Sequence, residues 1–274
     1  MENEVLDFKE KKGNGGLGIS SGIIIVACIV VGILIWKFVL GAESNFKDGN
    51  PEGLALGFLG QVFQGGKIVP VLLGMLLMVI VFTIERLLVI GKASGKKNLD
   101  KFMKNVMVSI NSGNINDAID ECDEQKGSVA NAIKSALLKY QDVKKEGLSS
   151  EAAAETIHKE IEEATSLEMP MLEKNMTILS TLVSLGTLGG LMGTVSGMIS
   201  AFSALASTGT PDQAKLASGI SEALINTLTG IFTSAVAIIA YNFFTSKIDT
   251  LTYSIDEAGN AIVNAYRKFR GTNK

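Results

Sequence analysis

Two apolar segments in the second half of the chain, 172–206 and 218–246, contain many polar side chains. The first includes Thr181, Ser184, Thr187, Thr194, Ser196 and Ser200, and the second includes Ser218, Ser221, Glu222, Asn226, Thr227, Thr229, Thr233 and Ser234. A single helical hydroxyl can bond to its own backbone and then says little about function. Two apolar segments that both carry many hydroxyls are expected either to join each other by hydrogen bonds or to border a hydrated path.

Glu222 is the one acidic residue inside the segment 218–246. An ionisable group inside a membrane is a functional hypothesis by default, but Glu222 lies about one turn into its segment, so an interfacial position is the alternative. No carboxylate, histidine or lysine occupies the middle of an apolar segment. A proton path through this chain would therefore need a protonatable group from a partner.

Glycines recur every four residues in the segment 172–206, at Gly189, Gly193 and Gly197. Residues four apart lie on one face of a helix, and small residues there let two backbones approach closely in a membrane. These glycines are predicted to pack helices together.

Other chemistries are disfavoured by composition. The 274-residue chain has one histidine, two cysteines and a formal net charge of −3. Cys28 lies in an apolar run and Cys122 in a charged segment, so neither a disulfide nor a metal site is expected, and no cofactor or nucleic-acid partner is expected either. An intramembrane serine protease using Ser196 or Ser200 would lack a base, because His158 lies among charged residues. The sequence does not predict an enzyme.

Four segments are long and apolar enough to span a bilayer, which takes about 20 residues. They are 19–41, 68–91, 172–206 and 218–246. The first has lysines before it and small residues after it, as a signal peptide would, so cleavage within residues 1–42 stays an alternative. Its length favours a retained transmembrane helix.

The placement of lysine and arginine predicts the orientation of the chain, because cytoplasmic loops carry the excess of positive charge. Positive charges are frequent in the parts expected to be cytoplasmic: the N-terminal tail 1–18, the helical region 92–171 and the helical extension 247–274. They are sparse in the parts expected to be periplasmic, the loop 42–67 and the short loop 207–217. Both termini are therefore predicted to be cytoplasmic.

Helical periodicity continues outside the spans. Apolar residues of the polar region recur at three- and four-residue spacing, for example in the stripe Ala154, Ile157, Ile161, Ala164 and Leu167. The same spacing continues from Ile248 to Phe269. A helix over 172–206 would be about 50 Å long, longer than a hydrocarbon core of about 30 Å. The predicted fold is all-α: a polytopic membrane protein with four transmembrane helices, two of them extended into a cytoplasmic helical bundle.

Four passages resemble the MotA/TolQ/ExbB proton-channel family, closest to ExbB and TolQ. They are IERLLVIGKA at 84–93, SGNINDAIDECDEQKGSVANAIKSAL at 112–137, LEKNMTILSTLVSLGTLGGLMGTVSGMISAF at 172–202 and ASGISEALINTLTGIFTSAVAIIAYNFF at 217–244. The segment 19–41 is additional to the usual ExbB/TolQ plan. Gly186-Thr187 stands where the family often has Ala-Pro, next to its glycine-rich core.

The resemblance implies a homo-oligomer, typically a pentamer, around a single-span ExbD/TolR-like partner whose aspartate carries protons. It implies that Thr194 and Thr227 face the pore, with Glu222, Asn226 and Ser196 also on the proton path. In the ExbB case the complex works with a TonB/TolA-like protein in the bacterial inner membrane and uses the proton motive force to energise TonB-dependent outer-membrane transport. A TolQ-type subunit for envelope maintenance, another MotA-like stator and a non-conducting membrane scaffold remain alternatives.

Overall fold

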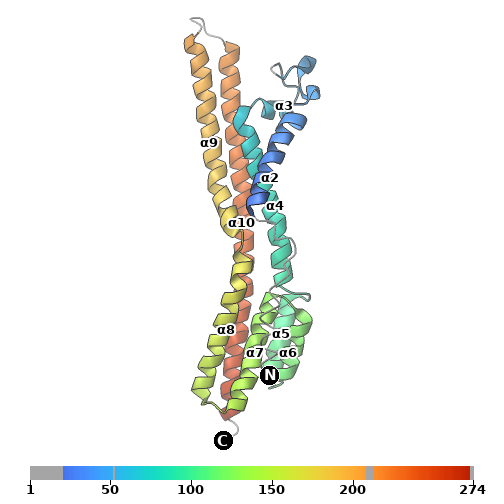
Figure 1. Ribbon diagram of the computed structural model, residues 1–274, viewed down its shortest axis with the longest axis vertical. Coiled ribbons are helices and arrows are strands. Elements are labelled where there is room, and N and C mark those ends of the chain that lie inside the picture. The colour runs from blue at the N-terminus through green and yellow to red at the C-terminus, as the bar shows by residue number, and fades with distance from the viewer. Residues whose placement is uncertain (1–20, 52, 208–212, 272–274) are drawn as a thin grey trace. The chain divides into compact units, whose positions relative to one another are not determined.

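The computed structural model describes residues 21–51, 53–207 and 213–271, and the described part is almost entirely helical (Figure 1). The elements are α2 (Ser21–Leu34), the π-helix η1 (Ile35–Leu40), the short 3-10 helices η2 (Glu43–Asn45), η3 (Lys47–Gly49) and η4 (Gly66–Ile68), and the helices α3 (Phe58–Phe63), α4 (Val69–Ala93), α5 (Leu99–Asn111), α6 (Ile115–Gln125), α7 (Ser128–Glu146), α8 (Ser150–Glu173), α9 (Met176–Ser207) and α10 (Gln213–Gly271). Within these ranges one isolated bridge, between Phe46 and Ala55, is the only β pairing. The predicted all-α class is confirmed.

Four stretches of helix are long and apolar enough to cross a membrane, as the sequence predicts. They are Ser21–Leu40, Gly66–Ala93, Ser150–Ser203 and Gln213–Phe269. The predicted extension of the last span is present, because α10 continues without interruption to Gly271. The predicted tail 1–18, residues 19–20 and the middle of the predicted loop 207–217 lie outside the described residues.

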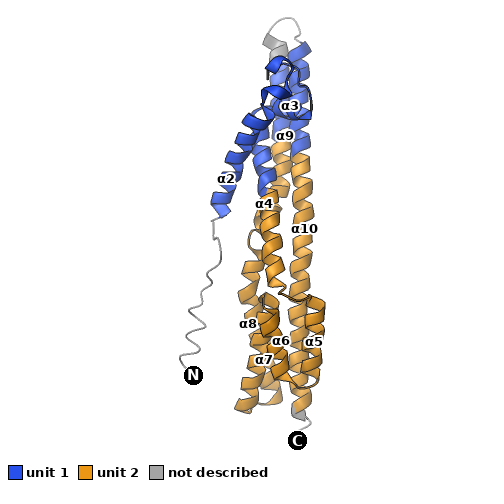
Figure 2. Ribbon diagram, turned by 90° about the vertical axis from the view of Figure 1, so that its right-hand side faces the viewer, with its two compact units in different colours: residues 1–78, 192–229 blue, residues 79–191, 230–274 orange. Residues whose placement is uncertain are grey.

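The chain divides into two compact units, and α4, α9 and α10 each contribute residues to both (Figure 2). Unit 1 comprises residues 1–78 and 192–229, of which residues 21–51, 53–78, 192–207 and 213–229 are described. The rest of the chain, 79–191 and 230–274, forms unit 2.

In unit 1, the additional first helix packs against the start of α4. Gly32 lies so close to Gly74 that an added Cβ would be 2.7 Å from the Gly74 nitrogen. Beyond α2, Trp36 stacks on Phe63 with ring centroids 4.6 Å apart, and its Nε1 donates to the Phe63 carbonyl at 3.3 Å. These contacts tie α2 to α4 and η1 to the segment 42–67, which contains short helices in place of the predicted loop.

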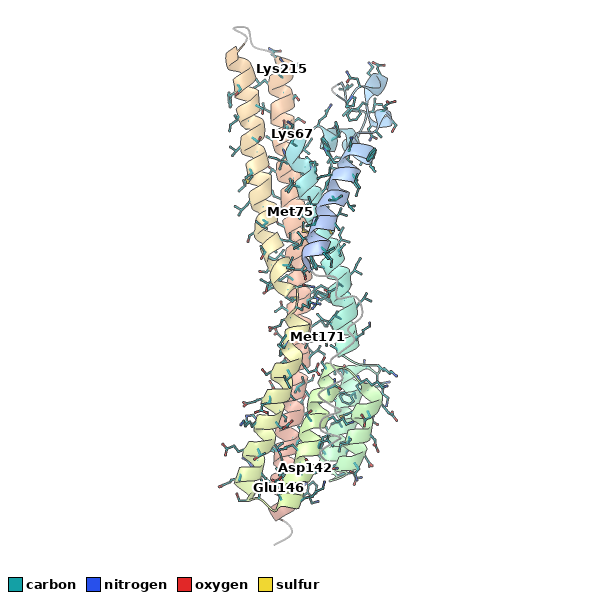
Figure 3. All side chains as sticks on the ribbon, viewed as in Figure 1. Lys67, Met75, Asp142, Glu146, Met171 and Lys215 are labelled. Carbon is teal, nitrogen blue, oxygen red and sulfur yellow. The ribbon has the colours of Figure 1, made fainter. Side chains whose placement is uncertain are left out.

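In unit 2, α5, α6, α7 and α8 pack as successive neighbours around an apolar core. The edge of the Tyr140 ring meets the Tyr266 ring of α10, with centroids 5.0 Å apart. Asn98 and Ser149 cap α5 and α8 by accepting hydrogen bonds from backbone N–H groups. Figure 3 shows the acidic residues Asp142 and Glu146 near the end of α7.

Two expectations about this region are wrong in detail. Leu167 is 82% exposed, although the predicted stripe placed it with the buried Ala154, Ile157 and Ile161. At 100° per residue it lies roughly 100° from the centre of that stripe, which instead continues to the buried Leu172. The predicted helix 172–206 is also not continuous from its first residue, because α8 ends at Glu173 and α9 begins at Met176.

Candidate functional site

Thr194 of α9 and Thr227 of α10 are hydrogen-bonded to each other through their hydroxyl groups in unit 1. Both side chains are half-buried. The Thr227 hydroxyl also lies 3.2 Å from the Ala223 carbonyl, one turn earlier in its own helix. The structure thus brings together the two threonines that the sequence analysis singled out, although they are far apart in the sequence.

Asn226, the neighbour of Thr227, is fully buried in unit 1. Its Nδ2 donates to the Gly65 carbonyl at 2.8 Å, just before α4 begins. Its Oδ1 is buried without a hydrogen-bond partner among the described residues. Gly193 provides the space for this side chain, since an added Cβ would collide with Asn226. The asparagine therefore links α10 to the start of α4, a contact that sequence spacing does not reveal.

Glu222 lies one turn before Asn226 and is half-buried. Its carboxylate fills the space beside Gly66, where φ is +81° and a Cβ would meet the carboxylate. Glu222 and Asn226 therefore both contact the Gly65–Gly66 turn. Ser196, the remaining predicted site residue, lies on the exposed side of α9.

The glycines of α9 allow close approach to α10 at two levels of unit 1. Gly193 faces Asn226, and an added Cβ at Gly197 would lie 2.8 Å from the Ala223 nitrogen. Gly189, which belongs to unit 2, is half-buried. Close backbone approach brings short hydroxyl side chains of the two helices within hydrogen-bond distance.

A second hydroxyl pair joins the same two helices within unit 2. Thr187 and Ser234 are hydrogen-bonded at 2.9 Å, and the Ser234 hydroxyl donates to the Val183 carbonyl at 2.6 Å. An added Cβ at Gly186 would lie 2.6 Å from the Ser234 oxygen, so this glycine permits the contact. The hydroxyl-rich character of α9 and α10 thus produces a helix–helix bond in each unit.

Arg86 is a further functional candidate. In the sequence it stands out only as part of the passage IERLLVIGKA at 84–93. It is 1% exposed in unit 2 and forms an ion pair with Glu85, with Nε and Oε2 2.6 Å apart. Its Nη1 donates to the carbonyls of Met171 and Leu172 at 3.2 and 3.1 Å. These carbonyls belong to the last turn of α8, where the backbone acceptors have no partner within the helix.

Cys122 is not suited to nucleophilic chemistry. It is buried in α6, and this burial, the largest cause, together with the negative charge of Asp123, raises the pKa of its thiol to about 12. A thiol with such a pKa stays protonated near neutral pH and is a poor nucleophile. Among the described residues, no cluster of three or more histidine, cysteine, aspartate or glutamate side chains is suited to hold a metal ion.

The sequence of the chain is similar to one protein family and to several curated proteins. The model of the MotA/TolQ/ExbB proton channel family matches residues 123–257. A putative biopolymer transport protein, ExbB-like 3, of Synechocystis sp. is 31% identical over 146 residues, which are 52% of this chain and 70% of the relative. The Tol-Pal system protein TolQ of Pseudomonas aeruginosa is 28% identical over 159 residues, 58% of this chain and 69% of the relative. The biopolymer transport protein ExbB of Neisseria gonorrhoeae is 26% identical over 207 residues, 71% of this chain and 90% of the relative.

Four spanning helices and two hydroxyl-bonded helices among them define an all-helical, multi-pass membrane protein with a polar helix interface. The chain belongs to the MotA/TolQ/ExbB proton channel family and is of the ExbB/TolQ kind.

Proposed function

We propose that this chain is the proton-path subunit of an ExbB–ExbD-type complex in the bacterial inner membrane. The complex uses the proton motive force to energise TonB-dependent transport across the outer membrane. The observation that carries the proposal is the Thr194–Thr227 hydroxyl pair, which joins α9 and α10 at the two positions that match the pore-facing threonines of the family. The printed names of the ExbB relatives, biopolymer transport proteins, support a transport role.

The proton carrier of the path comes from a second protein in this proposal. Between residues 176 and 247 the sequence has only two acidic residues, Asp212 and Glu222. Hydroxyl groups exchange hydrogen bonds but do not hold an excess proton at neutral pH, so the path needs a carboxylate near its middle. A single-span ExbD/TolR-like helix with one aspartate supplies this group, and a TonB/TolA-like protein receives the resulting motion.

The assembly is a homo-oligomer in the lipid bilayer, which we propose to be a pentamer around the partner helix. Both termini and the helices α5 to α8 lie on the cytoplasmic side in this proposal, with the segments 42–67 and 207–217 on the periplasmic side. The positive charges of the sequence support this orientation. Thr194, Thr227, Asn226, Glu222 and Ser196 line the path, and the glycines of α9 hold the helix pair together.

A TolQ-type subunit that maintains the cell envelope is the second candidate function. The similarity to TolQ of Pseudomonas aeruginosa favours it, and the two branches have the same pore motifs. A MotA-like stator fits the four-span plan less specifically. A non-conducting scaffold would use the same glycines and hydroxyls for packing alone.

Copurification in mild detergent tests the need for a partner. We expect a single-span protein with a membrane aspartate to be recovered with this chain, and its identity separates the ExbB branch from the TolQ branch. Recovery of the oligomer without any such protein would count against both branches.

The Thr194→Val and Thr227→Val variants test the path itself. Each variant keeps the side-chain shape but removes one hydroxyl of the pair, so we expect an intact complex with strongly reduced proton flux in proteoliposomes. Thr181→Val is the matched control, because this exposed threonine of α9 donates only to its own helix, at the Thr177 carbonyl. Flux equal to that of the unchanged complex in all three variants would remove the hydroxyl pair from the path, and an unchanged complex without flux would support the scaffold.

A further inference from the structure

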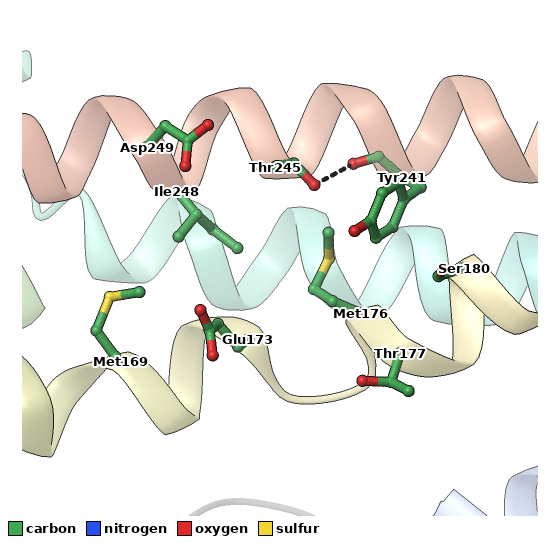
Figure 4. A pocket seen from close by; sticks show the side chains of 9 residues that line it. All are labelled: Met169, Glu173, Met176, Thr177, Ser180, Tyr241, Thr245, Ile248 and Asp249. Atoms are coloured by element: carbon green, nitrogen blue, oxygen red, sulfur yellow. Dashed lines mark hydrogen bonds between the residues drawn. The ribbon is translucent and has the colours of Figure 1, made fainter.

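A pocket with both polar and apolar walls lies in unit 2 where the chain passes from α8 to α9 (Figure 4). Its volume is about 290 Å³, enough for a cluster of water molecules. Its lining includes Glu173 at the end of α8, Thr177 and Ser180 in the first turns of α9, and Tyr241 and Asp249 on α10. With Thr245 of α10, the pocket combines two carboxylates with four hydroxyl groups, and nothing in the proposed function accounts for it.

Because the helix is broken between α8 and α9, the end of α8 and the start of α9 both line the pocket. Lys174 is extended with ψ of 135°, and Asn175 has a φ of +65°, so the helix cannot continue through them. Arg86 stabilises the break by binding the Met171 and Leu172 carbonyls, and Glu85 accepts a hydrogen bond from Asn175 at 3.3 Å. The buried arginine makes the interruption a fixed feature of unit 2.

Within unit 2, hydroxyl residues recur at one spacing on the two helices. Thr187 and Ser180 are seven residues apart on α9, and Ser234 and Tyr241 are seven apart on α10. Seven residues are close to two helical turns, so each set keeps to one face of its helix. Thr187 and Ser234 are hydrogen-bonded to each other, and the next residues of the two series, Ser180 and Tyr241, both line the pocket.

The two carboxylates of the pocket are available to water. Glu173 and Asp249 are exposed, and neither forms an ion pair with any of the residues that the structure describes. Figure 4 shows them on opposite walls, with the Tyr241 hydroxyl pointing between the helices. A carboxylate in this position can take a proton from pocket water and pass it to bulk solvent.

We propose that this pocket is the cytoplasmic exit vestibule of the proton path, with Glu173 and Asp249 as its proton acceptors. The inference rests on the proposed function. The carboxylate gains one proton from a hydronium ion in the pocket, which becomes water, and then loses that proton to a water molecule on the cytoplasmic side. Only O–H bonds form and break, and no oxidant or further reactant is needed. Thr177, Ser180 and Tyr241 hold the water that connects the Thr187–Ser234 pair to the two acids.

The test is the proton flux of the copurified complex in proteoliposomes that contain a pH-sensitive dye and very little buffer. The double variant Glu173→Gln, Asp249→Asn keeps the shape of both side chains and removes their proton affinity. We expect about a tenfold or larger loss of flux relative to the unchanged complex. Raising the concentration of imidazole, a small mobile buffer, should restore the flux, because the buffer then replaces the missing acceptors.

The double variant Glu163→Gln, Glu257→Gln is the matched control, since it neutralises exposed carboxylates of α8 and α10 outside the pocket. Its flux should equal that of the unchanged complex. Normal flux of the pocket variant at low buffer would overturn the vestibule, and so would a loss that imidazole does not restore, because that loss is structural. An unchanged complex that conducts no protons would instead refute the proposed function.

Discussion

At the scale of single residues, the candidate path depends on how closely α9 and α10 approach. Gly193 lies against Asn226, Gly197 lies against Ala223, and the hydroxyls of the neighbouring Thr194 and Thr227 are hydrogen-bonded to each other. A substitution of either glycine by alanine would therefore change the site by pushing the two helices apart. The polar contacts follow from that packing, because short side chains reach each other only across a narrow interface.

Gly193→Ala should destabilise the folded protein by about 1–3 kcal/mol, since the new methyl group would overlap the Asn226 side chain. Thermal unfolding in detergent measures the effect. Gly91→Ala is the control, because no atom lies within 4 Å of an added Cβ at this position of α4, and alanine favours the helix. A Gly193→Ala protein as stable as the Gly91→Ala protein would contradict the described packing.

Cys122 provides a residue-scale prediction outside the membrane spans. Burial is the main cause that raises the pKa of this thiol to about 12, so the reactive thiolate forms only as the pH rises towards that value. In a Cys28→Ser background, iodoacetamide at pH 8.5 should modify Cys122 at least about 100-fold more slowly in the folded protein than in denaturant. Rapid modification of the folded protein would show that α6 is not packed as described.

At the scale of elements, the feature that matters most is the interruption between α8 and α9. Pro170 lies in the last turn of α8, the backbone turns at Asn175, and Arg86 of α4 satisfies carbonyls that the broken helix leaves free. A helix end in an apolar environment needs such a partner, since an unbonded buried carbonyl costs about 1–3 kcal/mol.

Arg86→Met should lower the stability of the protein by about 2–4 kcal/mol, because it removes three hydrogen-bonding groups and leaves Glu85 without its ion pair. Arg86→Lys should recover only part of this loss, since a lysine lacks the planar fork that reaches Glu85 and both carbonyls together. Lys92→Met, on the exposed surface near the end of α4, is the control. Equal melting temperatures for the three variants, measured by circular dichroism, would remove Arg86 from this role.

The sequence predicted the spans and the long α10 well, because apolar length and helical spacing are local signals. It also selected Thr194 and Thr227, through the motifs that contain them. The break at Asn175 was missed, because an asparagine in the left-handed region is a weak signal without its tertiary partners. The contacts of Asn226 with Gly65 and of Arg86 with α8 join residues distant in the sequence, so spacing along the chain contains no trace of them.

At the scale of the whole molecule, the sequence contributes polar side chains to the predicted spans but has no acidic residue in the middle of any span. Four helices qualify as membrane spans, and the described polar side chains of α9 and α10 within 176–203 and 218–246 are hydroxyls, the amides of Asn226 and Asn242, and the carboxylate of Glu222. Such a protein can shape a hydrated path and orient water. In the proposed function, another polypeptide carries the proton across the middle of the bilayer.

Proton flux into proteoliposomes with and without the copurified partner tests this central claim most directly. We predict flux for the complex, none above the empty-vesicle level for this chain alone, and none for a complex whose partner has its membrane aspartate replaced by asparagine. Proton-specific flux through the purified chain alone, equal to that of the complex, would contradict the claim.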